Sequence, residues 1–252
     1  GEVFYQDIPT SKTYKIDIDG KLSVLKLDAK KASGTSFGPD GKRYVAAGAT
    51  KQILSYDASE KETVVADSIS GNDLVVANNE NIYITSPDGT QKPSKIYLLR
   101  TGGEKLIVDE GIKFANGITL SPDQTQLYVT ESATHWVWVY QIQPDGTLAF
   151  KQHYGWLHVP DNEENAWPDG LRCDTAGRVY VTSRSGIQVL DQTGRVNAII
   201  PIPSGQASNI CFGGKNFDTI YVTAVDKVYR RKLRVRGANT FERPYKPVAP
   251  RL

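Results

Sequence analysis

The sequence contains no methionine, two cysteines and three histidines in 252 residues. Cys173 and Cys211 cannot form a disulfide framework, and their alternating apolar surroundings favour buried free thiols. His135, His153 and His158 lack the spacing that places two metal ligands on one face of an element. No apolar run is long enough to span a bilayer. The 30 basic and 28 acidic residues leave a net charge of +2, so we expect neither a nucleic-acid nor a membrane partner.

Several catalytic motifs are also absent. No Gly-x-Ser-x-Gly elbow occurs, which argues against a serine-nucleophile hydrolase. No phosphate-binding or dinucleotide fingerprint occurs, and the glycine pairs at 102–103 and 213–214 are typical of turns. The chain starts at Gly1 rather than methionine, so we expect further residues before Gly1 in the native protein. The sequence does not indicate a compartment, and a secreted or periplasmic location and a cytoplasmic one stay open.

What the sequence does contain is a repeat. Residues 168–182 read PDGLRCDTAGRVYVT, two strand-like runs joined by a polar turn. Related copies occupy residues 34–46, 71–85, 115–130 and 208–223, and the chain opens inside a sixth, partial copy at 3–7. The second residue of each full copy recurs every 37 to 53 positions. We call these five the aligned residues: Thr35, Asn72, Asn116, Asp169 and Asn209.

Strand-rich repeats of this period are typical of propeller blades. The sequence therefore predicts one all-β domain over residues 1–252, a six-bladed β-propeller with four-stranded blades. The first blade is expected to lack its innermost strand. The last blade is expected to take its fourth strand from residues 234–237. Residues 244–252 contain three prolines and are expected to form an extended C-terminal tail.

The first strand of a propeller blade lines the central channel, so four of the aligned residues, Asn72, Asn116, Asp169 and Asn209, are expected to converge at one mouth of the axis. A ring of amide and carboxylate oxygens suits a hard cation such as Ca²⁺. The alternative is that each Asn or Asp forms only a local turn with backbone. For Asn116 and Asp169, which occupy the same register in adjacent copies, we favour the cation site.

These motifs also carry a resemblance to a known family. Residues 71–74 (GNDL), 115–118 (ANGI), 168–171 (PDGL) and 186–191 (GIQVLD) resemble those of the gluconolactonase and regucalcin (SMP-30) family of six-bladed propellers. The resemblance implies hydrolysis of a lactone or ester with one divalent cation. Ca²⁺ is favoured, and Zn²⁺, Mg²⁺ and Mn²⁺ are alternatives. It implies Asn116 and Asp169 as metal ligands, Asn72 as a metal or substrate ligand, and Asp169 as general base.

Two departures from the family pattern bear on function. The family's Glu ligand belongs to a segment that would precede Gly1, and we expect it there in the native chain. An Arg of the animal proteins is replaced by Ser70, so substrate recognition is expected to differ. We expect Arg184, His135 and Trp167 to contact a sugar lactone, with residues 155–167 as a lid over the channel mouth. The alternatives are that Arg184 and His135 are ordinary polar surface residues, and that 155–167 is an acidic surface loop with Trp167 packed between blades. The alternatives are a non-catalytic propeller that binds a sugar or protein, and a hydrolase of another ester such as an organophosphate.

Overall fold

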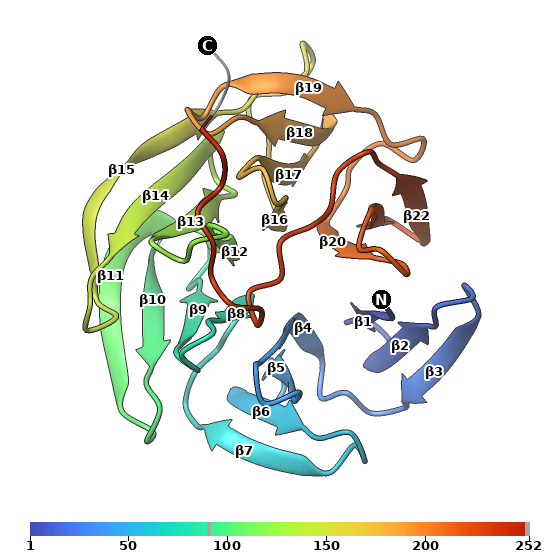
Figure 1. Ribbon diagram of the computed structural model, residues 1–252, viewed down its shortest axis with the longest axis vertical. Coiled ribbons are helices and arrows are strands. Elements are labelled where there is room, and N and C mark those ends of the chain that lie inside the picture. The colour runs from blue at the N-terminus through green and yellow to red at the C-terminus, as the bar shows by residue number, and fades with distance from the viewer. Residues whose placement is uncertain (90–91, 250–252) are drawn as a thin grey trace.

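The computed structural model describes residues 1–89 and 92–249 and shows six antiparallel sheets arranged in a ring. Figure 1 looks along the ring axis, with the innermost strand of each sheet nearest the centre. No helix occurs in these two ranges, and none of the described residues form a helix long and apolar enough to cross a membrane. The predicted all-β, six-bladed propeller is confirmed.

The strands follow one another from the axis outwards within each blade. The first blade has β1 (Val3–Asp7), β2 (Lys12–Ile16) and β3 (Leu22–Lys26); the second has β4 (Ala32–Phe37), β5 (Arg43–Ala47), β6 (Gln52–Tyr56) and β7 (Glu62–Ala66). The third has β8 (Leu74–Val76), β9 (Ile82–Ser86), β10 (Pro93–Leu99) and β11 (Lys105–Lys113). The fourth has β12 (Ala115–Leu120), β13 (Gln126–Glu131), β14 (Trp136–Ile142) and β15 (Leu148–Trp156). The fifth has β16 (Leu171–Cys173), β17 (Val179–Ser183), β18 (Gly186–Leu190) and β19 (Val196–Ile200); the sixth has β20 (Asn209–Gly213), β21 (Thr219–Ala224) and β22 (Lys227–Lys232).

Aspartates organise the hairpins that join these strands. Asp174 Oδ1 accepts hydrogen bonds from the backbone N–H groups of Ala176 and Arg178, at 2.9 and 3.0 Å. Gly177 follows with φ of 76°, a conformation that costs glycine little. The backbone N–H groups in a tight turn have few carbonyl acceptors, and the aspartate side chain accepts their hydrogen bonds instead. An Asp-x-x-Gly segment such as 174–177 can therefore end one strand and start the next.

The first blade has three strands, as expected, but the last blade also has three. The predicted fourth strand at 234–237 is wrong. Its alternating residues suggest an outer strand, yet only Gly237 pairs, in an isolated bridge with Asp174 of the fifth blade. Gly237 lies so close to Phe212 that an added Cβ would be 2.2 Å from the ring. The chain therefore turns in toward the axis here and does not pair with β22.

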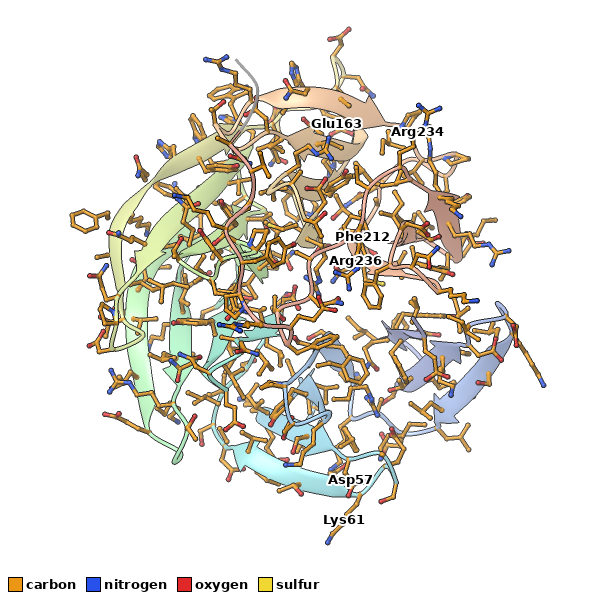
Figure 2. All side chains as sticks on the ribbon, in the orientation of Figure 1. Asp57, Lys61, Glu163, Phe212, Arg234 and Arg236 are labelled. Atoms are coloured by element: carbon orange, nitrogen blue, oxygen red, sulfur yellow. The ribbon has the colours of Figure 1, made fainter. Side chains whose placement is uncertain are left out.

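From Gly237 the chain crosses the end of the ring where the inner strands finish (Figure 1). Asn78 Nδ2 donates to the Phe241 carbonyl, Gln124 Nε2 donates to the Thr240 carbonyl, and Tyr245 N donates to the Pro122 carbonyl. Figure 2 shows Arg236 and Phe212 near the middle of this face. We call residues 236–248 the C-terminal strap. Of the predicted tail, residues 250–252 lie outside the described residues.

The core lies between neighbouring blades. Ile96 and Leu98 of β10 pack with Ile118 and Leu120 of β12 in one cluster, each at most 1% exposed. Burying an aliphatic side chain of this size stabilises a fold by about 1.5–3 kcal/mol. Because each blade packs against the next, the inner strands are held in fixed positions around the axis.

Candidate functional site

One cavity of about 380 Å³ lies at the end of the channel where the inner strands begin. All five aligned residues line it: Thr35, Asn72, Asn116, Asp169 and Asn209. Strand β1 forms part of the wall through Phe4, Tyr5 and Gln6. No further strand pairs with the inner edge of β1 among the described residues, so the cavity extends sideways between the first and sixth blades.

Buried threonines on the second strands hold the backbone of this ring. The Thr85 hydroxyl lies 2.5 Å from the carbonyl of Asn116 in the next blade. The Thr130 hydroxyl donates to the Asp169 carbonyl at 2.8 Å. The Thr182 hydroxyl lies 2.9 Å from the Gly170 carbonyl and 3.1 Å from the carbonyl of Ser208, which precedes Asn209. All three threonines are 0% exposed, so the third, fourth and fifth blades each contact the backbone at or next to the aligned residue of the blade that follows.

Ser132 orients the side chain of Asn116. The Ser132 hydroxyl donates to the Pro168 carbonyl and accepts a hydrogen bond from Asn116 Nδ2 at 2.9 Å. A hydroxyl has one proton to give, so the Asn116 amide must present its nitrogen to Ser132. Its oxygen therefore points away from Ser132 and is the atom left to bind a ligand. Asn209 differs, because its Oδ1 accepts the hydrogen bond of the next backbone N–H at 2.8 Å.

Asp169 places a partly buried carboxyl in the cavity wall. Burial raises its pKa, the negative charge of Asp73 raises it further, and the nearby Asn116 amide opposes this only in part, so the pKa rises to about 7. The residue keeps partial exposure toward the cavity. A carboxyl with this pKa can both hold and release a proton near neutral pH.

Asp73 is a second carboxyl that the sequence reasoning missed. It is 2% exposed, its Oδ1 accepts the Leu74 N–H at 2.8 Å, and burial raises its pKa although Arg172 opposes this. Its Oδ2 has no hydrogen-bond partner among the described residues and lies 3.8 Å from an Arg172 nitrogen. Gly34 makes room for the carboxyl, since a Cβ there would be 2.6 Å from Asp73 Oδ1. The sequence contains a signal for it: the residue that follows the aligned residue is glycine in two later copies, Gly117 and Gly170, but an acid, Asp73, in this one.

The remaining predicted residues fall into two groups. Trp167 lines the cavity together with Asn72, Asn116 and Asp169. Arg184 does not line it, but its guanidinium lies 5.6 Å from the Trp167 ring centroid and pairs with Glu163. Figure 2 shows Glu163 near β18.

His135 also lies away from the cavity lining, in an aromatic cluster of the fourth blade. Its ring centroid is 3.7 Å from that of Trp156, and burial lowers its pKa. The segment between β15 and β16 is anchored to the fifth blade, since Gln188 exchanges two hydrogen bonds with the backbone of His158.

The cavity has features that fit a divalent cation. No group of three or more His, Cys, Asp or Glu side chains within residues 1–89 and 92–249 could hold a metal ion, so a cation here would depend on amide oxygens as well as carboxylates. Asp73 Oδ2 has no hydrogen-bond partner among the described residues, and burial raises the pKa of both Asp73 and Asp169. The surrounding protein therefore only partly compensates the negative charge that these carboxyls carry when ionised. A hard cation bound by Asp169, Asn116 and Asn72 would compensate it.

A six-bladed propeller with a cavity that contains Asn and Asp side chains at one mouth of its channel is one class of ligand-binding β-protein. Within this class, the chain belongs to the SMP-30/Gluconolactonase/LRE-like family, whose model matches residues 1–226.

Known proteins support this assignment. The chain is 29% identical over 234 residues to a gluconolactonase of Zymomonas mobilis, covering 82% of this chain and 64% of that protein's length. The structure resembles a gluconolactonase of Xanthomonas campestris with a TM-score of 0.80 at 23% identity, covering 94% of this chain and 82% of that one. It also resembles regucalcin, a calcium-binding protein of Agrobacterium tumefaciens, with a TM-score of 0.74 at 18% identity over 98% of this chain and 93% of that one.

Proposed function

We propose that this protein hydrolyses sugar lactones with the help of a divalent cation. Ca²⁺ is the favoured ion, and Zn²⁺, Mg²⁺ and Mn²⁺ are alternatives. The observation that carries the proposal is the convergence of Asp169, Asn116 and Asn72 on one cavity in a chain of this family. The Zymomonas mobilis relative is named a gluconolactonase, and the Agrobacterium tumefaciens neighbour a calcium-binding protein. The cavity volume of about 380 Å³ suits a small cyclic ester.

The side chains divide the work of hydrolysis as follows. Asp169 holds a water molecule and accepts a proton from it as the water oxygen attacks the lactone carbonyl carbon. The ring C–O bond then breaks, and the departing ring oxygen takes up the proton that Asp169 had accepted, which gives the open hydroxy acid and restores the Asp169 carboxylate. Asn72 forms hydrogen bonds with substrate hydroxyls. A bound cation would supply Lewis-acid polarisation of the carbonyl and a lower pKa for water.

The test is a panel of sugar lactones, aryl esters and organophosphates, followed with a pH indicator because hydrolysis releases acid. We expect hydrolysis of sugar lactones that is lost on chelation and restored by Ca²⁺. Asp169→Asn should abolish hydrolysis and weaken Ca²⁺ binding measured by calorimetry. Asn209→Ala is the matched control, because its amide oxygen already serves the backbone.

The panel also separates the alternatives. If the protein hydrolyses aryl or organophosphate esters but no lactone, the proposed substrate class is wrong and the proposed cation site still stands. A folded protein that neither binds Ca²⁺ nor hydrolyses any compound of the panel would favour a non-catalytic propeller and would refute the proposal.

A further inference from the structure

Two aromatic residues at the cavity have an unusual backbone conformation. Phe114 has φ of 56° and Trp167 has φ of 45°, a left-handed region that residues with a bulky side chain rarely adopt. Each stands two positions before an aligned residue, Asn116 or Asp169. Strain of this kind persists where the surrounding structure imposes it, and it clusters at ligand sites.

The conformation brings both rings to the cavity. Phe114 and Trp167 line it, with ring centroids 6.3 Å apart and planes inclined by 31°. They form one continuous aromatic surface beside Asn116 and Asp169. The other three copies have small residues at this position: Ser33, Ser70 and Ala207. At this position of the repeat, aromatic residues therefore occur only beside Asn116 and Asp169, while Phe4 and Tyr5 of β1 line another part of the cavity.

Buried polar groups hold Phe114 in place. Glu131 is 5% exposed, and its carboxylate accepts the Lys113 backbone N–H at 2.8 Å and the Trp138 indole N–H at 3.0 Å. The Ser132 backbone N–H donates to the Phe114 carbonyl at 3.0 Å. These bonds fix the backbone on one side of Phe114 and its own carbonyl, so the strained conformation is imposed from the fourth blade.

Trp167 has its own supports. Asn165 Oδ1 accepts the Trp167 backbone N–H at 2.7 Å. The Arg184 guanidinium lies 5.6 Å from the ring centroid, within the range of a cation–π contact, and it pairs with Glu163.

We propose that Phe114 and Trp167 form an aromatic wall that sets substrate specificity by packing flat against the C–H face of a sugar lactone ring. An aromatic face is electron-rich and binds weakly positive groups, and the C–H bonds of a sugar ring present such groups on one side. The inference rests on the proposed function and adds to it the residues that select a ring with a flat, extended C–H face.

The test uses a matched pair of glycine variants. Phe114→Gly removes the ring and relieves the backbone strain, so the fold should survive. Phe150→Gly is the control, because Phe150 is also an aromatic residue in the left-handed region, with φ of 52°, but is 72% exposed and away from the cavity. We expect Phe114→Gly to raise KM for glucono-δ-lactone about tenfold with kcat within twofold, and Phe150→Gly to change neither.

Two further variants distinguish an aromatic face from simple bulk. Phe114→Tyr keeps the flat ring and should retain the original KM, whereas Phe114→Leu keeps apolar volume and should raise KM as glycine does. Phe114→Leu also serves if the glycine variant does not fold. An unchanged KM in both Phe114→Gly and Phe114→Leu would overturn the aromatic wall while leaving lactone hydrolysis intact. A wild-type protein that hydrolyses no lactone would overturn the proposed function itself, and the wall with it.

Discussion

Replacing Asp169 by Asn should stabilise the cation-free protein at high pH and leave it unchanged at low pH. The folded-state pKa of Asp169 is about 7, against roughly 3.9 for an unperturbed Asp. Well below pH 4 the carboxyl is protonated in both folded and unfolded chains, so it does not alter the free energy of unfolding. Between pH 4 and 7 the folded chain holds a proton that the unfolded chain has lost, so stability falls as pH rises.

The magnitude follows from the size of the shift. Roughly three pKa units at 1.36 kcal/mol each give about 4 kcal/mol, which is an upper value because Asp73 shares the charge repulsion. Asn has nearly the same shape and no charge, so at pH 8 Asp169→Asn should unfold at a temperature up to roughly 8–16 °C higher than the wild type. At pH 4 the two proteins should unfold together.

The assay is thermal unfolding in chelator at pH 4, 6 and 8, repeated with excess Ca²⁺. Ligand at a hundredfold excess over its Kd stabilises a protein by about 2.7 kcal/mol. The wild type should gain this full stabilisation from Ca²⁺, and Asp169→Asn should gain less.

Asp191→Asn is a control of opposite sign. Burial raises the pKa of Asp191, but hydrogen bonds from Thr193, Arg195 and Asn197 outweigh it and lower the pKa to about 2, so this variant should lose stability at pH 8. If Asp169→Asn shows no advantage at pH 8, the uncompensated charge is not at Asp169. If Ca²⁺ raises the unfolding temperature of the wild type and of Asp169→Asn equally, Asp169 is not a ligand.

Three further outcomes are expected. Asn116→Ala should weaken Ca²⁺ binding in calorimetry by tenfold or more, because one neutral oxygen ligand is lost, while Asn209→Ala changes it least; equal effects would contradict the ligand set. Thr130→Val should cost about 1–3 kcal/mol in urea unfolding because a buried carbonyl loses its donor, with Thr130→Ser restoring it; full stability of the valine variant would show that the hydroxyl is dispensable. Cys173 is 2% exposed and burial raises the pKa of its thiol, so iodoacetamide at pH 8 should modify it only in urea; rapid labelling of the folded protein would contradict its burial.

Much of the fold could be predicted because it depends on local signals that repeat. Turns containing Asp or Gly and alternating apolar residues recur along the chain, so Asn72, Asn116, Asp169 and Asn209 could be placed at one mouth of the channel from the sequence. The fourth strand expected at 234–237 failed for a non-local reason. Gly237 packs on the Phe212 ring and bridges to Asp174, contacts between segments that no local pattern encodes.

The site was less predictable for the same reason. Asp73 is buried against Gly34 and Arg172 from two other blades, so its proximity to Asp169 depends on how separate copies meet at the axis. Phe114 follows an ordinary outer strand, and only its backbone conformation turns its ring to the cavity. The roles assigned to Asn72, Asn116, Asp169, Trp167, Arg184 and His135 stay predictions that the variants above test.

The C-terminal strap affects where small molecules can enter and leave the channel. Because it crosses the end of the ring opposite the cavity, and Arg172 lines both the cavity and the space beneath the strap, the strap narrows any passage along the axis at that end. Substrate and product would then enter and leave mainly through the cavity mouth and the space between the first and sixth blades. A product molecule still in the cavity would compete with the next substrate, so turnover should slow as product accumulates in the surrounding solution.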